Sequence, residues 1–315
     1  MGEAAGAERP GPQVVVELAT HRFARRRFRD LPRALHPGRP PRLSDDPGRF
    51  RTRCDPWFEA GGRAAFLVAR VAGDPVPVGR CTAHHLDGGE EGWFGFLDTV
   101  DDEEVGAAAV AALVRWAGRL LAEEGCTSLT GPASYRLDQE AGVQEGEAEE
   151  VTGRPATPAW LGPALAAAGL APGEGRPTWR LAVADVAAGA MAAAPHLVHR
   201  LPRTIRPWSD PRLLLAEPGV GQVVAVPDIA GPWRAAGGPL GLASRAARRQ
   251  WDTAVVLELE GDPAVVVPAL AAAAAAAGYR DLVSPWAPAG AGRPEAVHRL
   301  YTRGLRRPEV DTPRP

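Results

Sequence analysis

Acidic residues inside an apolar, strand-like run are the clearest candidates for chemistry in this sequence. Glu258 and Glu260 lie among Val256, Leu257 and Leu259. Because successive side chains of a strand alternate between its two faces, we expect both carboxylates on one face. A carboxylate placed beside a bound ligand can act as a general base. The alternative is that both carboxylates lie on the wet face of a half-buried strand.

Motifs for other kinds of catalysis are weak. His84 and His85 are neighbours in a strand-like run, so their side chains should point to opposite faces and cannot share a metal ion. His196 and His199 are three residues apart, but no acidic or cysteine partner follows at the spacing of a zinc site. The sequence also lacks a Gly-x-Ser-x-Gly nucleophile motif. We therefore expect no metal cofactor.

Two residue types are missing, and their absence excludes whole enzyme classes. All 36 basic residues are arginine, and the chain contains no asparagine. Without lysine there is no Schiff base for PLP or aldolase chemistry, no Walker lysine and no protein-kinase ATP lysine. Without asparagine there is no N-glycosylation acceptor and no Cys-His-Asn protease site.

Length, charge and cysteine content favour a two-domain protein of the cytoplasm. A chain of 315 residues predicts about two domains. The net charge of −2 provides no basic footprint for nucleic acid. Cys54, Cys81 and Cys126 form no disulfide pattern, which favours a reducing compartment. The longest apolar run, 263–278, is shorter than a membrane span of about 20 residues, so we expect no membrane partner.

Hydrophobic periodicity predicts a mixture of strands and helices in the first part of the chain. The clearest helix is expected over 101–124, with one apolar face and four acidic residues in its first turn. The expected strands are 14–18, 64–71, 76–84, 92–100, 127–130 and 179–184, and the other expected helices are 21–35 and 158–168.

A linker rich in alanine and glycine separates a second part that repeats this order in outline. Its expected strands are 213–217, 222–226, 253–260 and 281–286, and its expected helical segments are 233–250, 263–277 and 293–303. We predict an α/β protein with a mixed sheet. The predicted division is a disordered tail (1–12), a first domain (13–186), a linker (187–198) and a second domain (199–315).

The element order is the one used by the GNAT N-acetyltransferase superfamily, and several stretches look familiar as well. Residues 92–102 (GWFGFLDTVDD), the pair Gly131-Pro132 and residues 225–229 (AVPDI) resemble those of bacterial tandem GNAT-like proteins, most of which are uncharacterised. Residues 298–305 (HRLYTRGL) look like the last helix of a GNAT domain. The resemblance implies two GNAT-like domains in tandem.

The resemblance also implies acetyl-CoA or another acyl-CoA as co-substrate. In such proteins the central strand pairs with the pantetheine arm, and the pyrophosphate lies on backbone N–H groups at the start of the next helix. The positions that match are Leu97, Thr99, Gly106, Ala108 and Gly261. The match is imperfect, because Glu103 stands where the family has arginine or glutamine. The acids at 101–104 either repel a pyrophosphate or simply stabilise the helix.

Catalytic roles follow from the same resemblance. Asp98 in the first half and Glu258 and Glu260 in the second are the candidate general bases. Tyr301 is the candidate general acid on the last helix, and Trp160 stands at its place in the first half. Residues 131–142 resemble the loop that meets ligands, and its candidate pocket residues are Ser134, Tyr135 and Asp138.

Two functions therefore remain open. The first is an acyl-CoA-dependent N-acyltransferase that acts on a small-molecule amine, as a monomer or homodimer. The second is a catalytically inactive GNAT-like protein that binds a small ligand or a partner protein. Use of aminoacyl-tRNA as donor is disfavoured by the balanced charge. For a transferase, we expect the central and fifth strands of at least one half to separate into a V-shaped cleft. The arginines at 22–29 either bind phosphates, such as the 3′-phosphate of CoA, or form a solvated helix face.

Overall fold

The structure is a computed structural model. It describes residues 11–40, 42, 58–135, 141–146, 149–151, 153–187, 213–217, 221–228, 230–236 and 252–306. All statements below concern these residues.

The described strands form one sheet of twelve strands, in the order β1-β2-β3-β4-β5-β12-β7-β11-β10-β9-β8, with β6 paired to β12. In the first half, the strands β1, β2, β3 and β4 pair in this order, each antiparallel to the next, and β4 pairs with β5 in parallel. The elements of this half are β1 (Val14–Leu18), α1 (Arg22–Leu35), β2 (Gly62–Val71), β3 (Pro77–Leu86), β4 (Glu91–Thr99), α4 (Glu103–Glu123), β5 (Ser128–Gly131), β6 (Val143–Glu145) and α5 (Leu161–Ala167).

The second half repeats this pattern with fewer strands. Antiparallel pairs join β8, β9 and β10, and β10 pairs with β11 in parallel. Its elements are α6 (Val183–Ala187), β8 (Leu213–Glu217), β9 (Gly221–Pro227), α7 (Ala230–Ala236), β10 (Thr253–Gly261), α9 (Pro263–Ala276) and β11 (Asp281–Ser284).

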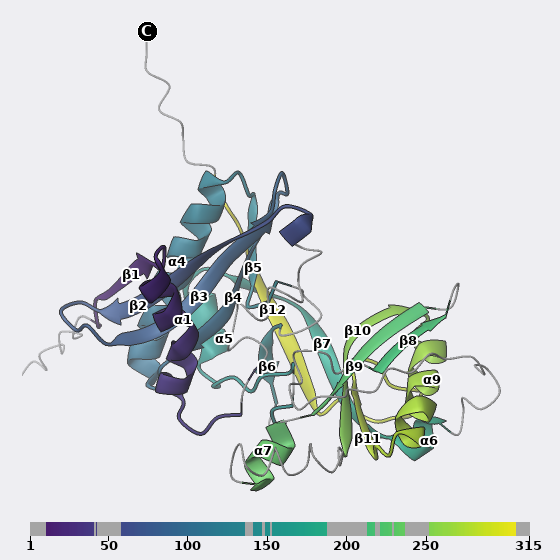
Figure 1. Cartoon of the computed structure of the whole chain (residues 1–315). Helices are drawn as coiled ribbons and strands as arrows, with labels where there is room; N and C mark the ends of the chain where they lie inside the picture. The colour runs from purple at the N-terminus through teal and green to yellow at the C-terminus, as the bar shows by residue number, and fades with distance from the viewer. Residues whose placement is uncertain are drawn as a thin grey trace, which may run out of the picture.

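Two strands join the halves. β7 (Ala171–Ala182) pairs with β12 over 171–178 and with β11 over 179–182, so one strand runs through both parts of the sheet. β12 (Ala296–Gly304) returns from the end of the chain and inserts between β5 and β7. Figure 1 shows this strand in yellow beside the teal strands of the first half. The first part of the sheet is therefore completed by the last described strand.

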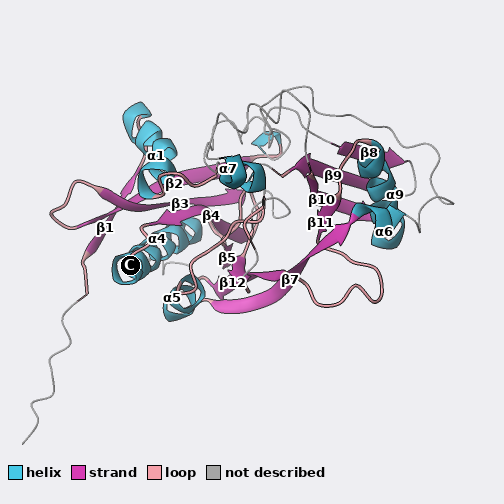
Figure 2. Ribbon diagram, turned by 90° about the horizontal axis from the view of Figure 1, so that it is seen from below, coloured by secondary structure: helices cyan, strands magenta, loops and turns pink. Residues whose placement is uncertain are grey.

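Helices cover the two faces of the first part unequally. α1 lies on one face, and α4 and α5 lie on the other (Figure 2). The side chains of β2 reflect this arrangement. Leu67 and Ala69 pack in the core under α4, whereas Val68 packs in the core that contains Phe28 and Leu31 of α1. This alternation is the two-residue period of a strand with both faces buried.

A third core lies where the two halves meet. In the second half, α9 and α6 cover one face of the sheet. The opposite face contributes Val226, Val255, Leu257 and Val283 to the same cluster as Tyr135, Val151 and Phe96 of the first half. The halves are thus held by apolar packing as well as by strand pairing. The buried residues of this cluster are Ala19, Phe28, Leu31, Val68, Phe96, Tyr135, Val151, Val226, Val255, Leu257 and Val283.

The predicted last helix is wrong, because residues 296–304 form strand β12. The burial of Ala296, His298 and Tyr301 shows a strand-like alternation that is interrupted by a register shift between Arg299 and Tyr301. That shift hides the two-residue period in the sequence. The segment is a strand because β5 and β7 offer it hydrogen-bonding edges on both sides.

Most other predicted boundaries agree closely, but the strand predicted over 179–184 begins at Ala171 and ends at Ala182, where helix α6 follows. Part of the prediction lies outside the described residues. This applies to the tail over 1–10, to the linker over 188–198, to 237–250 of the helical segment predicted over 233–250, and to Asp138. The division into domains 13–186 and 199–315 stays a prediction, although strand pairing crosses it. β12 belongs to the predicted second domain by sequence and pairs with β5, β6 and β7 of the first.

Among the described helices, α4 is the one long and apolar enough to cross a membrane by length and composition. Its residues Val110, Leu113 and Ala117 are fully buried against the first sheet. These contacts are those of a core helix.

The tight contact between β4 and the segment after β5 allows a direct test. A Cβ atom on Gly95 would lie 1.5 Å from the carbonyl oxygen of Ala133. We expect Gly95→Ala to lower the free energy of unfolding by about 3 kcal/mol, because backbone must move to relieve the overlap. Urea denaturation measures this loss. Gly304→Ala, at a strand position with open space around it, is the control and should change stability by less than about 0.5 kcal/mol. Equal effects of the two substitutions would contradict the register of β4 and β5.

Candidate functional site

The predicted site residues separate into two groups that lie in different halves of the molecule. Glu258, Glu260 and Gly261 lie on β10, in the second half. The remaining described candidates lie in the first half and are Leu97, Asp98, Thr99, Gly106, Ala108, Ser134, Tyr135 and Tyr301. Tyr301 therefore does not share a site with the two glutamates, contrary to what its place near the chain end suggested.

In the first half, β4 and β5 pair over a short stretch only. The parallel register joins Glu91–Trp93 to Ser128–Thr130, and the Ala133 N–H then donates to the Phe94 carbonyl at 2.8 Å. Beyond this point β4 continues to Thr99 with a distortion at Phe96, whose φ is 50°. The described hydrogen bonding between the two segments therefore ends at Phe94, and a V-shaped cleft between the strands stays a prediction.

The backbone groups of Thr99 have the orientation expected for ligand binding. The Val100 N–H donates to the Val78 carbonyl at 2.9 Å, so Val100 faces β3. Because backbone groups alternate in direction along an antiparallel pair, Thr99 directs its own away from β3, whereas Leu97 lies at the register shift between Asp98 and Gly95. That side is the one that β5 has left.

Asp98 is a buried ion-pair partner and lacks the character of a general base. Arg80 Nη2 lies 2.8 Å from its carboxylate, Arg39 Nη1 lies 2.7 Å away and Arg42 Nη1 lies 3.7 Å away. Burial alone would raise the pKa of Asp98, but the three guanidinium charges outweigh it and hold the pKa well below its usual range. A carboxylate stabilised so strongly in its charged form has little tendency to take a proton. The prediction of Asp98 as a base is not supported.

The arginines around Asp98 extend the cluster to the second half. Arg80 is completely buried, and its guanidinium also lies over the Phe28 ring at 4.9 Å. Arg42 binds Glu150 through two hydrogen bonds of 2.8 Å. Arg234, on α7 of the second half, donates to the Glu150 carbonyl at 2.8 Å. Sequence analysis missed this cluster, because its members are separated by up to 195 positions and no local pattern joins them.

The start of α4 is crowded by acidic residues and by the Trp160 ring. The Asp102 carboxylate accepts from the Val105 N–H at 2.9 Å, and the Gly106 N–H donates to the Asp102 carbonyl at 2.7 Å. A Cβ atom on Gly106 would lie 2.6 Å from the Trp160 ring, so this ring packs directly on the glycine. Gly106 and Ala108 are residues within the helix and do not form a loop before it. Their prediction as pyrophosphate ligands is not supported.

Tyr301 belongs to the core of the first half. Its side chain is buried together with Val143, Leu161 and Leu165, and a Cβ atom on Gly162 would lie 2.6 Å from its hydroxyl. Burial raises the pKa of Tyr301, and the charge of Glu145 adds to the rise. This geometry favours a packing role for Tyr301 over a role as general acid.

Ser134 and Tyr135 are buried between the halves. His84 Nε2 lies 3.2 Å from the Ser134 carbonyl, and the Tyr135 ring contacts the rings of His84, Phe58 and Phe96 at centroid distances of 5.2, 5.1 and 4.9 Å. Burial lowers the pKa of His84 to about 3. The polar loop thus begins as part of the interface core. The role of these residues as pocket lining stays a prediction.

The second half repeats the strand separation. β10 and β11 pair in parallel over Thr253–Val255, and β10 then continues to Gly261 with a register shift between Val256 and Glu258. Arg154 of the first half donates to the Val256 carbonyl at 3.3 Å, where the strands part. Arg154 also contributes to lowering the pKa of the buried His298 to about 4, although burial is the larger cause.

The start of α9 carries fewer acids than that of α4. Asp262 caps the helix by accepting from the Ala264 N–H at 2.9 Å, and the Val265 and Val266 N–H groups donate to the Asp262 carbonyl at 3.0 Å. Pro263 has no N–H to offer. Glu260 is exposed nearby in sequence. The N–H groups at the start of α9 are therefore engaged by Asp262, and its first turn contains no glycine.

Within the described residues, no three His, Cys, Asp or Glu side chains gather as metal ligands do.

Comparison with known proteins gives a likeness of fold. No protein-family model matches the sequence, and no curated protein matches it. A solved structure, the tandem GNAT protein from the clavulanic acid biosynthesis pathway (without AcCoA), superposes with a TM-score of 0.51 over 93% of this chain and 98% of that one. The chain has a tandem GNAT fold. The sequence identity is 14%, so this likeness is one of fold.

A GCN5-related N-acetyltransferase from Kribbella flavida is also similar, at 15% identity, with a TM-score of 0.44 over 92% of this chain and 72% of that one. We base the fold assignment on the first structure. Within the tandem GNAT fold, β4 and β10 are the two central strands, and α4 and α9 are the helices that follow them.

Removal of the buried carboxylate tests the Asp98 cluster. We expect Asp98→Asn to lower the free energy of unfolding at pH 7 by about 3–5 kcal/mol, because three arginines lose their buried partner. Since the folded-state pKa is depressed, this stabilisation is present above the unfolded pKa of about 3.9 and disappears as the pH falls below it. The difference between wild type and variant should therefore shrink below about pH 4 in urea titrations.

The control for this experiment is Asp87→Asn, which breaks the exposed ion pair with Arg63. We expect it to cost less than about 1 kcal/mol. Equal losses for the two variants would contradict the special role of Asp98.

The buried histidines predict a separate pH dependence. Burial holds the pKa values of His84 and His298 at about 3 and about 4, so both stay neutral in the folded protein while the unfolded chain binds protons below about pH 6.5. Stability should therefore fall as the pH decreases from about 6.5 to 4, by about 1.4 kcal/mol per unit for each histidine. Urea midpoints at several pH values measure this slope.

His298→Gln should reduce that slope by about half, because one of the two histidines no longer titrates on unfolding. His21→Asn is the matched control, since His21 is exposed and asparagine can still cap α1. A slope that is unchanged by His298→Gln would overturn the assignment.

Proposed function

We propose that this protein is an acyl-CoA-dependent N-acyltransferase and that its acyl donor binds in the second half. The observation that carries the proposal is the separation of β10 from β11. The strands pair over three residues, and the backbone from Val256 to Gly261 then runs on without β11. In a tandem GNAT fold, such a strand is the place where a pantetheine arm can add its own backbone-like hydrogen bonds.

The comparison of the two helix starts favours the second half. Asp101 and Asp102 precede α4, and Glu103 and Glu104 are its first two residues. The Trp160 ring packs on Gly106 in the first turn. α9 has Asp262 alone at its cap and no acid in its first turn. Since an anion is repelled by carboxylates and attracted by the positive end of a helix, α9 is the more favourable neighbour for a pyrophosphate.

The second half fits an acyl-CoA well along β10 and less well at the start of α9. The edge of β10 beyond Val255 suits the pantetheine arm. The first N–H groups of α9 are already bonded to Asp262. A pyrophosphate would therefore compete with the Asp262 side chain for the Ala264 N–H. We propose that this competition limits the affinity for the donor.

The acceptor in this proposal is a small-molecule amine. Acyl-CoA supplies an activated thioester, at which the amine nitrogen replaces sulfur. Glu258 and Glu260 on β10 are the proposed general bases that take the amine proton. Arg154 places a cation at the point where β10 and β11 part, through its bond to the Val256 carbonyl. This cation would favour an acceptor that carries a carboxylate beside its amine.

The second candidate is an inactive GNAT-like protein that binds a ligand or a partner protein. It is favoured by the engaged N–H groups at the start of α9 and by the burial of Tyr301 away from β10. In that case the tandem fold would serve for binding only.

A thermal shift with acetyl-CoA and free CoA tests the donor site. Binding at 100 times Kd should stabilise the protein by about 2.7 kcal/mol. We expect Asp262→Ser, which keeps a helix cap and removes a charge, to tighten CoA binding about two- to fivefold. Asp102→Ser makes the same change at α4 and should leave the affinity unchanged. Release of free thiol from acetyl-CoA with a panel of small amines then measures transfer.

The outcomes separate the candidates. No stabilisation at millimolar CoA would reject the transferase and support the binding protein. Tighter binding in Asp102→Ser but not in Asp262→Ser would move the donor site to the first half. CoA binding without thiol release for any amine would also favour an inactive protein.

A further inference from the structure

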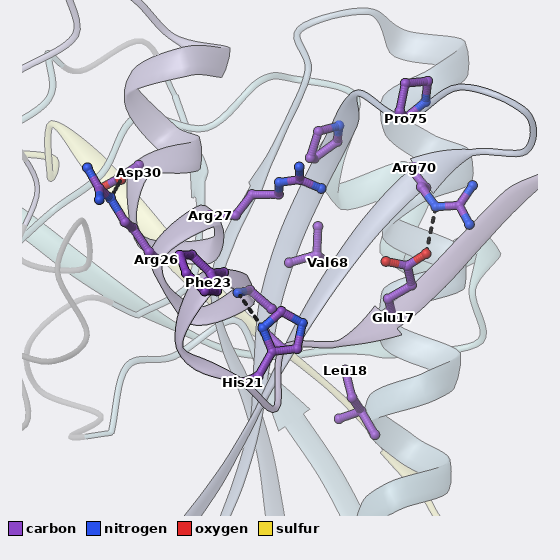
Figure 3. A pocket seen from close by; sticks show the side chains of 13 residues that line it. Glu17, Leu18, His21, Phe23, Arg26, Arg27, Asp30, Val68, Arg70 and Pro75 are labelled. Atoms are coloured by element: carbon purple, nitrogen blue, oxygen red, sulfur yellow. Dashed lines mark hydrogen bonds and ion pairs between the residues drawn. The ribbon is translucent and has the colours of Figure 1, made fainter.

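A groove at the outer edge of the first half lies apart from the proposed donor site. It is formed between α1, the end of β1, β2 and the turn between β2 and β3, and its volume is about 470 Å³. Figure 3 shows it from close by. Its lining residues are Glu17, Leu18, Ala19, His21, Phe23, Ala24, Arg26, Arg27, Asp30, Val68, Arg70, Pro75 and Pro77. The groove is on the strands farthest from β10 within the first half of the sheet.

Apolar side chains are concentrated around this groove. Among the described residues, four large hydrophobic side chains are exposed, and three of them are at the groove. Phe23 is 78% exposed and Leu18 is 41% exposed, and both line it. Val76 is 61% exposed and lies between two lining prolines. Exposed apolar side chains scattered singly need no explanation, but such a gathering around a concave surface indicates a binding site.

The charge of the groove favours an anion. Helix α1 carries six arginines and one aspartate, although the whole chain has a net charge of −2. Arg70 pairs with Glu17 at 2.7 Å, and Arg26 pairs with Asp30 at 3.5 Å. Within the described part of the chain, Arg27 forms no such ion pair. Figure 3 shows its side chain extending from α1 toward the strand that carries Val68.

The end of α1 that faces the groove adds a partial positive charge to that of the arginines. The His21 Nδ1 accepts from the Ala24 N–H at 3.3 Å and so caps the helix. No acidic residue lies in the first turn. An anion held here would therefore be bound by the Arg27 guanidinium and be favoured by the positive end of the helix.

We propose that this groove binds a small amphipathic carboxylate, with the carboxylate on Arg27 and an alkyl or aryl body against Phe23 and Val68. The volume lies within the range of small-molecule pockets, which is about 300–1,000 Å³. Among the described residues that line the groove, Arg27 is the one arginine without an ion pair, so it selects one negative charge, and the apolar walls select a hydrophobic body. The proposal does not depend on acyltransfer, because none of these residues lies on β10 or α9.

Titration with octanoate, followed by NMR of the amide groups of the full chain, tests this site. We expect shifts confined to α1, β1 and β2, and a Kd that rises about tenfold in Arg27→Gln through loss of the charge-assisted bond. Arg33→Gln is the matched control, because Arg33 is exposed on the same helix and does not line the groove. Its Kd should equal that of the wild type. Octylammonium, which has an eight-carbon chain and a positive head group, tests whether binding needs a negative charge on the ligand. Propionate, which has a carboxylate and a short chain, tests whether binding needs an apolar body.

Weak binding of octylammonium and of propionate, together with the Arg27 effect, would support the proposal. It would be overturned by octylammonium binding as tightly as octanoate, by equal losses in the two arginine variants, or by no shifts at millimolar octanoate. Binding of an acidic peptide without binding of octanoate would show a protein-docking surface and would equally reject it. Because CoA is absent from this titration, its result is independent of the donor-site experiment.

Discussion

The pairing of β12 with β5 on one side and β7 on the other is the constraint on which the rest of this structure depends. It places the end of the chain inside the sheet of the first half. Because β7 continues from β12 to β11, one hydrogen-bonded sheet spans both halves. A backbone connection of this kind fixes the two parts far more firmly than side-chain contacts alone. It also brings the first-half residue Arg154 to the Val256 carbonyl of β10.

Buried ion pairs and hydrogen bonds also connect the two halves. Asp98, on the central strand of the first half, is held by arginines from β3 and from the segment after α1. Arg42 leads from Asp98 to Glu150, and Arg234 of α7 reaches the Glu150 carbonyl. Charges at the central strand of this half therefore serve to join segments. This use leaves the strand poorly suited to proton transfer, because its carboxylate is strongly stabilised in the ionised form.

The two halves have the same order of elements but differ in the residues at the start of the helix that follows each central strand. Both central strands part from their parallel neighbours after a short register. At α4, the Trp160 ring packs on Gly106 and acidic residues surround the helix start. At α9, a single aspartate caps the helix. The start of α9 therefore carries fewer acids than the start of α4, and this difference is the basis for proposing the donor site in the second half.

Local patterns were enough to predict most elements, including α4 with its apolar face and acidic first turn, and α9 with Pro263 at its start. They failed for residues 296–304, where a register shift interrupts the strand period. The sequence by itself determined the helices, the strands and the order typical of the tandem GNAT fold, because periodicity and caps are local properties. Only the tertiary structure decided that Asp98 would be surrounded by arginines, that Trp160 would cover Gly106, and that Tyr301 would lie in the first core. These are contacts between residues far apart in the chain, and their energies depend on burial and distance, which no local pattern contains.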